Sequence, residues 1–224
     1  LKYLKNKSVG KIWSLNSTPK KKTYDFIITI PCYNEYNYIF KTLDSISKQN
    51  LLLLKNTIVV IVVNNSDEDN NQIKKNNDAT YQKLKNSKYN FDFALIDCYS
   101  RNKTLSNKIA GVGMARKIGC DAMLKYGQPR SLLCFLDADT IVSPDYLNQI
   151  NDSQKKYNWD AAVVMLKHKN DEPKTNIIIQ KYELLLNETS QFLKKSGPPY
   201  NYIPIGSSMI CNIQTYISIG GMNT

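Results

Sequence analysis

The chain has 224 residues, of which 42% are hydrophobic and 22% are charged. This length suffices for one sizeable α/β domain with a buried core, and the composition is ordinary for a globular protein. No apolar run approaches the ~18 residues of a membrane-spanning helix, and the sequence contains neither a GxGxxG dinucleotide-binding turn nor a P-loop.

The net charge of +11 is concentrated near the N-terminus. Residues 1–22 contain seven lysines and no acidic residue, so they hold seven of the eleven charges and leave +4 for the rest. We expect residues 1–22 to form a basic, solvated arm ahead of a single domain at residues 23–224. An alternative for the arm is peripheral contact with an anionic membrane surface. The position of the charge argues against a nucleic-acid-binding protein.

The cysteine pattern indicates a reducing compartment. The five cysteines are scattered, odd in number and without CxxC spacing, and most lie in apolar runs: Cys32, Cys98, Cys120, Cys134 and Cys211. We therefore expect reduced core thiols in a cytoplasmic protein, with no zinc site implied.

Segments of strand and helix length alternate along the chain. We predict strands at 26–30, 57–63, 91–96, 132–136 and 161–166, and helices from 39, at 67–88, at 107–126, from 143 and at 176–195. Residues 57–63 read TIVVIVV, which is too continuously apolar for a sheet with one exposed face and indicates a parallel strand covered on both faces. The alternation predicts an α/β fold with a mainly parallel, Rossmann-like sheet and helices on both sides.

Two helix starts carry capping signals. Ile39, Leu43 and Ile46 share one helical face, and Asn34 ahead of them is a candidate N-cap. Ser143, followed by a proline and an aspartate, is a candidate N-cap for a later helix.

Polar residues follow three of the predicted strands. The first strand is followed by PCYNE at 31–35, the second by NNSDE at 64–68, and the strand LLCFL by Asp137, Ala138 and Asp139. In open α/β sheets, ligands bind at the carboxyl ends of the strands. The three polar clusters therefore predict a site at one edge of the sheet.

The pair Asp137 and Asp139 is a candidate metal site. Residues i and i+2 at a strand end project to the same side, and two bare carboxylates ~5 Å apart repel by roughly 3 kcal/mol at an effective dielectric constant of ~20. A hard divalent cation, Mg²⁺ or Mn²⁺, reverses that sign. The alternative is that Asp137 only ends the strand and Asp139 caps a turn. His168 is a third candidate ligand, although a histidine at a strand end is more often structural.

Five motifs in this order resemble the family 2 glycosyltransferases of the GT-A fold. They are IPCYNE, VVNNSDE, GVGMARKIG, FLDADTIVSPDYL and GSSMICNIQTYISIGGMN, and they span nearly the whole chain from Tyr24 onward. The resemblance implies a nucleotide pocket lined by Pro31, Tyr33, Asn34 and Glu35, with the Tyr33 ring against the base.

The resemblance also implies roles for the later motifs. Asn65 stands where the family usually has an aspartate that reads the base edge, so the identity of the base stays open. Arg116 would lie near the nucleotide, unless it is solvated or ion-paired as helical arginines often are. The remaining implied positions are Asp137 and Ala138 by the nucleotide-sugar, Asp137 and Asp139 on the metal, Gly206, Ser207 and Ser208 by the donor sugar, and a turn toward the acceptor at Gly220 and Gly221.

The implied function is metal-dependent transfer of a sugar, with inversion, from a UDP- or GDP-sugar to a hydroxyl group of a glycan, lipid or other acceptor. In the family the catalytic base lies in an acidic motif shortly after the Gly-Gly turn, which would fall beyond Thr224. We therefore assign no base, and expect this 224-residue chain to bind nucleotide and metal with little transferase activity. Two alternatives are a sugar nucleotidyltransferase, which needs a Gly-rich loop after the first strand, and a non-catalytic basic nucleotide- or nucleic-acid-binding protein.

Overall fold

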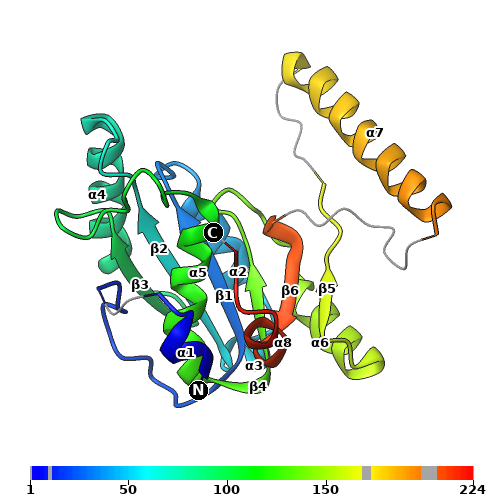
Figure 1. The fold of residues 1–224 in the computed structure, drawn as a ribbon, viewed down its shortest axis with the longest axis horizontal. Helices are drawn as coiled ribbons and strands as arrows, with labels where there is room; N and C mark the ends of the chain where they lie inside the picture. Colours follow the sequence, from blue (N-terminus) through cyan, green and yellow to red (C-terminus); the bar gives the residue numbers. More distant parts are fainter. Residues whose placement is uncertain (1, 10–11, 168–172, 198–205, 224) are drawn as a thin grey trace.

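A computed structural model describes residues 2–9, 12–167, 173–197 and 206–223, and shows a mixed α/β fold (Figure 1). The strands are β1 (Tyr24–Cys32), β2 (Thr57–Asn64), β3 (Asp92–Cys98), β4 (Gly127–Phe135), β5 (Ala161–Val163) and β6 (Met209–Asn212). The α-helices are α1 (Lys2–Asn6), α2 (Ile39–Ser47), α3 (Leu51–Leu54), α4 (Asn71–Lys85), α5 (Val112–Met123), α6 (Tyr146–Tyr157), α7 (Pro173–Lys195) and α8 (Ile213–Ser218).

The six described strands form one sheet in the order β3-β2-β1-β4-β6-β5. The first four are parallel, with Ile28 of β1 opposite Val59 of β2 and Cys134 of β4. β6 runs antiparallel to both of its neighbours. The predicted mainly parallel sheet is confirmed, and the carboxyl ends of β1, β2 and β4 lie side by side.

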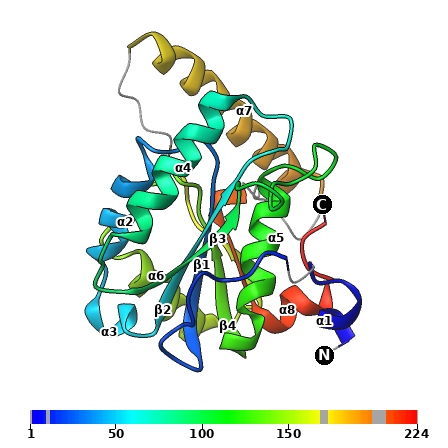
Figure 2. The same ribbon diagram turned by 90° about the vertical axis from the view of Figure 1, so that its left-hand side faces the viewer.

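Helices cover both faces of the sheet, as Figure 2 shows. α2, α3, α4 and α6 pack on one face and α1, α5 and α8 on the other, each over its own cluster of buried side chains. Every residue of β2 is buried, which confirms the two-sided strand predicted from TIVVIVV. α7 lies beyond the β5 edge in Figure 1 and exposes several large apolar side chains. No helix in the described part of the chain is long and apolar enough to cross a membrane.

Both of the predicted helix N-caps are wrong. α2 begins at Ile39 after Tyr38, and Asn34 instead adopts a left-handed backbone with φ of +61°. α6 begins at Tyr146, and its N-cap residue Asp145 makes no side-chain capping bond. The Ser143 carbonyl oxygen accepts from the Tyr146 N–H. In both places a turn intervenes between the capping-type residue and the helix.

Two further elements differ from the sequence prediction. α5 begins at Val112, because residues 107–111 form a loop that contacts the site described below. β6 was not predicted: it has only four residues and is inserted between β4 and β5. Its partners lie far away in the sequence, so no local pattern identifies it.

The N-terminal segment packs on the domain, which corrects the expectation of a solvated arm. Tyr3 of α1 is buried, and its hydroxyl donates to Asp121 Oδ1 at 2.8 Å. Trp13 Nε1 donates to the Lys103 carbonyl at 2.7 Å, and Leu15 forms an antiparallel bridge with Ile96. The described part of residues 1–22 therefore lies along the sheet and α5, although most of its lysines remain exposed.

All five cysteines are free, and all but Cys211 are buried. Burial raises the pKa of both Cys134 and Cys211 to about 12, which keeps them as thiols at neutral pH. The predicted core position of the cysteines is confirmed for all but Cys211.

Candidate functional site

A cavity of about 480 Å³ lies at the carboxyl ends of β1, β2 and β4. It is lined by Pro31, Tyr33, Glu35, Asn64, Ser66, Asp69, Asn107, Ala110, Gly111, Val112, Asp137, Ala138 and Asp139. Six of these residues were predicted for the site from the sequence: Pro31, Tyr33, Glu35, Asp137, Ala138 and Asp139. The three polar strand ends therefore meet in one place.

Negative charge gathers on one wall of this cavity. Asp139 is exposed, and Asp137 is partly exposed. Burial, together with the charges of Asp139 and Asp137, raises the pKa of the Glu35 carboxyl. Two acidic side chains therefore act on a third here, and of the three only Asp137 is paired with a described basic group.

That basic group is Arg116 on α5. Its Nη2 donates to Asp137 Oδ1 in an ion pair, and the arginine side chain is only 7% exposed. Arg116 Nε is buried with no partner among the described residues. Gly206 lies against the guanidinium, where a Cβ would overlap Nη1. Arg116 does not line the cavity itself, and so it acts on the site through Asp137, as the ion-paired alternative anticipated.

The acidic residues suit a divalent cation that takes most of its ligands from elsewhere. In the described part of the chain, no group of three or more His, Cys, Asp or Glu side chains could hold a metal ion. Mg²⁺ in proteins is commonly held by one or two carboxylates together with water and substrate phosphates. Asp137 and Asp139 fit that pattern, with Glu35 adding negative charge. His168 lies outside the described residues.

Asn65, which the resemblance places at the base, and Asn64, the last residue of β2, differ in their relation to the cavity. Asn65 is fully buried, and its Nδ2 donates to the Ser66 carbonyl at 2.9 Å. It does not line the cavity, so the geometry does not support a base-reading role for it. Asn64 lines the cavity instead, and its Oδ1 is buried with no partner among the described residues. A ligand N–H would satisfy that oxygen, because buried polar atoms normally have a hydrogen-bond partner.

A second cavity, of about 1330 Å³, lies on the other side of the acid pair. Asp137 and Asp139 line both cavities. The second one is bounded by residues of the segment after β4, of α6 and of β5, by Ile179 of α7 and by Ser207. Of the other predicted positions, Asn34 is exposed, Gly206 is partly buried and Ser208 is buried, and none of the three lines either cavity. The acid pair is therefore a shared wall between two spaces.

Sequence reasoning missed the wall formed by the loop after β3. Asn107, Ala110 and Gly111 line the smaller cavity from this loop. The Asn107 N–H donates to Asp67 Oδ1 at 3.0 Å, and its Nδ2 donates to Glu68 Oε2 at 2.7 Å. The loop has no periodic pattern, and only its contacts with the segment after β2 bring it to the site.

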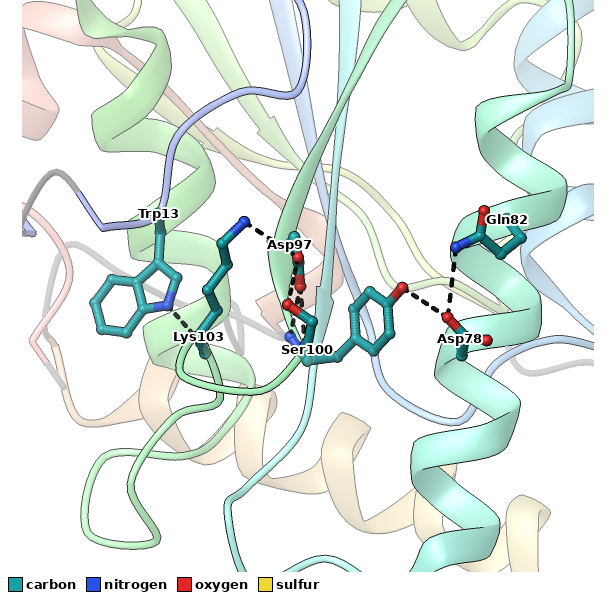
Figure 3. A network of polar contacts seen from close by, with 7 residues as sticks. Trp13, Asp78, Gln82, Asp97, Ser100 and Lys103 are labelled. Carbon is teal, nitrogen blue, oxygen red and sulfur yellow. Dashed lines mark hydrogen bonds and ion pairs between the residues drawn. The ribbon is translucent and has the colours of Figure 1, made fainter.

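Asp97 at the end of β3 organises the start of that loop (Figure 3). Its carboxylate accepts from Ser100 Oγ at 2.6 Å, the Ser100 N–H at 2.9 Å and Lys103 Nζ at 3.3 Å. Burial opposes the charge, but these hydrogen bonds outweigh burial and hold the Asp97 pKa below 3.8. The neighbouring Tyr99 hydroxyl donates to Asp78 of α4 at 3.0 Å. The loop is thus anchored at its beginning on two sides.

We expect Asp97→Asn to lower the free energy of unfolding by about 1–3 kcal/mol at pH 7, because hydrogen bonds to a charged group are lost. The folded-state pKa is depressed, so this stabilisation is present above the unfolded pKa and disappears as the pH falls through the folded value. Urea unfolding at pH 7, 5 and 3 measures it, with the exposed Asp152→Asn as control. A difference between Asp97→Asn and wild type that stays constant down to pH 3 would contradict this account.

Comparison with known proteins agrees with this arrangement. The model of the glycosyl transferase family 2 matches residues 27–212. A search of curated protein sequences finds no match.

Two solved structures share the fold. TarS 1–349 from S. aureus is 16% identical with a TM-score of 0.51, covering 87% of this chain and 49% of its own. The mannosyltransferase PcManGT from Pyrobaculum calidifontis, in complex with GDP-Man and Mn²⁺, is 17% identical with a TM-score of 0.50. The match covers 98% of this chain and 52% of PcManGT. This chain thus spans about half the length of these proteins. With the family model covering most of its residues, the chain belongs to glycosyl transferase family 2.

Proposed function

We propose that the chain is the nucleotide-sugar-binding part of a metal-dependent, inverting glycosyltransferase that uses a UDP- or GDP-sugar and a hydroxyl acceptor from a glycan, a lipid or another molecule. The observation that carries this proposal is the acid pair, Asp137 and Asp139, shared by two cavities. The smaller cavity would take the nucleotide and the larger one the acceptor. A sugar held at their common wall would then meet both.

The smaller cavity offers groups suited to a nucleotide. Tyr33 is 42% exposed and lines the cavity, so its ring can stack against a base. The free Asn64 Oδ1 can accept from a base N–H, and an amide also has donors for a base oxygen. Both uracil and guanine present such edges. The choice between UDP and GDP is therefore a question for measurement.

Asp137 and Asp139 would hold Mg²⁺ or Mn²⁺ together with the diphosphate. When bound, the cation supplies charge neutralisation on the leaving diphosphate. Arg116 would hold Asp137 in position, because its buried guanidinium is hydrogen-bonded to one carboxylate oxygen. Asp139 has no such partner among the described residues and is free to face the ligand.

The test is a thermal-unfolding panel with UDP, GDP, ADP and the corresponding nucleotide-sugars, each with Mn²⁺ or with EDTA. A ligand at a hundred times its Kd stabilises by about 2.7 kcal/mol. For a chain of this size, that is a rise in Tm of roughly 5–10 °C. We expect such a rise for UDP or GDP with Mn²⁺ only. If no nucleoside diphosphate raises Tm, the proposal fails. If Tm rises equally with Mn²⁺ and with EDTA, nucleotide binding stands but its dependence on metal is wrong.

The alternatives give different results in parallel assays. A sugar nucleotidyltransferase would release pyrophosphate from a nucleoside triphosphate and a sugar 1-phosphate. A basic binding protein would retain nucleic acid through its N-terminal lysines and would do so equally after Asp139 is replaced.

A further inference from the structure

A fully buried asparagine on α4 connects two walls of the smaller cavity. Asn77 Oδ1 accepts from the Asn34 N–H at 2.9 Å. Its Nδ2 donates to the Asn64 carbonyl at 2.9 Å and to Asn65 Oδ1 at 3.3 Å. Asn77 itself does not line the cavity. One side chain therefore bonds to the segment after β1 and to the end of β2.

This asparagine is unusual for its place in the helix. Asn is a poor residue for a helix interior, and the sheet-facing position at 0% exposure would ordinarily hold an apolar side chain. Its three hydrogen bonds all lead to other elements, so the amide satisfies groups outside its own helix. The Asn34 N–H belongs to a residue in a left-handed conformation, which needs support from its surroundings.

The hydrogen bonds from Asn77 to Asn34 and to Asn64, here called tethers, each end at or next to a residue that lines the cavity. Tyr33 directly precedes Asn34, and its hydroxyl donates to Asp69 Oδ1 at 2.8 Å. Asn64, whose carbonyl is bound by Asn77, lines the cavity, and its side-chain Oδ1 is buried with no partner among the described residues. A single buried side chain thus links the backbone next to the Tyr33 ring with the strand end that carries the Asn64 amide.

We propose that Asn77 is a positioning residue that sets the width of the base-binding part of the cavity. This inference rests on the proposed nucleotide-binding function. Losing the tether lets the two walls shift, which weakens recognition of the base although Asn77 never touches the ligand. The acid pair after β4 receives no hydrogen bond from Asn77, so contacts with the diphosphate and metal are unaffected.

The preceding residue provides a matched comparison. Asn76 Oδ1 accepts from the Tyr36 N–H at 3.3 Å, which ties α4 to the same segment after β1. Among the described residues, the Asn76 side chain makes no hydrogen bond to β2. Asn76→Ala therefore removes one tether without disconnecting the two walls, whereas Asn77→Asp keeps the acceptor for Asn34 and loses both donors to β2. Thr80→Val is a second control, because the Thr80 hydroxyl donates to the Asn76 carbonyl within the same helix.

The experiment measures Kd by calorimetry in Mn²⁺ for three probes: UDP, GDP and inorganic pyrophosphate. For Asn77→Asp we expect the Kd for the nucleotide that wild type binds to rise about 10- to 100-fold, because small displacements of binding groups can have effects of this size. Pyrophosphate, which has no base, should bind within about twofold of wild type. Asn76→Ala and Thr80→Val should leave all three values near wild type.

Each outcome decides a separate point. If UDP and GDP bind folded Asn77→Asp as tightly as wild type, Asn77 is not a positioning residue. An equal loss for nucleotide and pyrophosphate would mean general structural damage and would likewise overturn the inference. If Asn77→Asp does not fold, Asn77→Ala is measured with the same criteria. If wild type binds neither UDP nor GDP, the proposed function fails and this inference with it.

Discussion

Replacing Asp139 with asparagine is expected to abolish the metal-dependent part of nucleotide binding and leave the fold intact. Asp139 is exposed and accepts no hydrogen bond from the described residues, so its carboxylate contributes nothing to holding the structure together. Its charge raises the pKa of Glu35, and this repulsion disappears in the variant. The free protein should therefore be as stable as wild type or slightly more so.

The measurement is Kd for UDP and GDP with Mn²⁺ and with EDTA, together with Tm of the free protein. For Asp139→Asn we expect the Kd in Mn²⁺ to rise to the Kd in EDTA. Losses of about 10- to 100-fold are typical when a metal site is disturbed. Asp152→Asn, at an exposed position on α6, is the control. Equal affinity of wild type and Asp139→Asn in Mn²⁺ would remove Asp139 from the metal site.

Asp137 is a less selective position for the same test. Its carboxylate pairs with Arg116, so Asp137→Asn would also leave a guanidinium that is 7% exposed without its partner. A loss of binding in that variant could come from metal, from Arg116 or from local rearrangement. Because Asp139 has no such partner among the described residues, a loss of binding in Asp139→Asn can be attributed to the metal.

The second large effect is expected at Asp121, which lies at the junction of α1, α5 and α8. Its side chain is 2% exposed, and its two oxygens accept from the Tyr3 and Tyr216 hydroxyls and from the Val9 N–H. Lys117 Nζ lies 3.7 Å from Asp121 Oδ2 and donates to the Tyr3 hydroxyl at 2.8 Å. Asp121→Ala would leave these donors without their acceptor and Lys117 without its counter-charge.

Removing one partner of a buried ion pair costs about 3–5 kcal/mol, and we expect a decrease in the free energy of unfolding of that order for Asp121→Ala. Urea unfolding at pH 7 measures it, with Asp152→Ala as control. Deleting residues 1–9 removes Tyr3 and Val9 from the same cluster, so the deletion should also lower the free energy of unfolding. Asp121→Ala should then lower the free energy of unfolding less in the deleted chain than in the full chain. A change below 1 kcal/mol for Asp121→Ala would show that the cluster is not important for stability.

This result bears on the basic N-terminal segment. Gly221 has φ of +77° and lies against the Tyr3 ring, where a Cβ would overlap the hydroxyl. The segment therefore contacts the Gly-Gly turn as well as α5. Truncating the segment therefore changes the domain itself. Vesicle-binding tests of its lysines require charge reversal at the surface, as in Lys22→Glu at an exposed position.

Local sequence patterns determined most of the elements and half of the site. The runs TIVVIVV and LLCFL are continuously apolar, so their burial and the place of the acids that follow them could be predicted from the sequence alone. The sequence did not determine which of Asn64 and Asn65 enters the cavity, because a shift of one residue at a strand end moves a side chain to the opposite face. Nor did it predict β6, the loop at 107–111 or the packing of Tyr3. Their positions depend on partners tens to more than two hundred residues away, and only the folded chain brings those partners together.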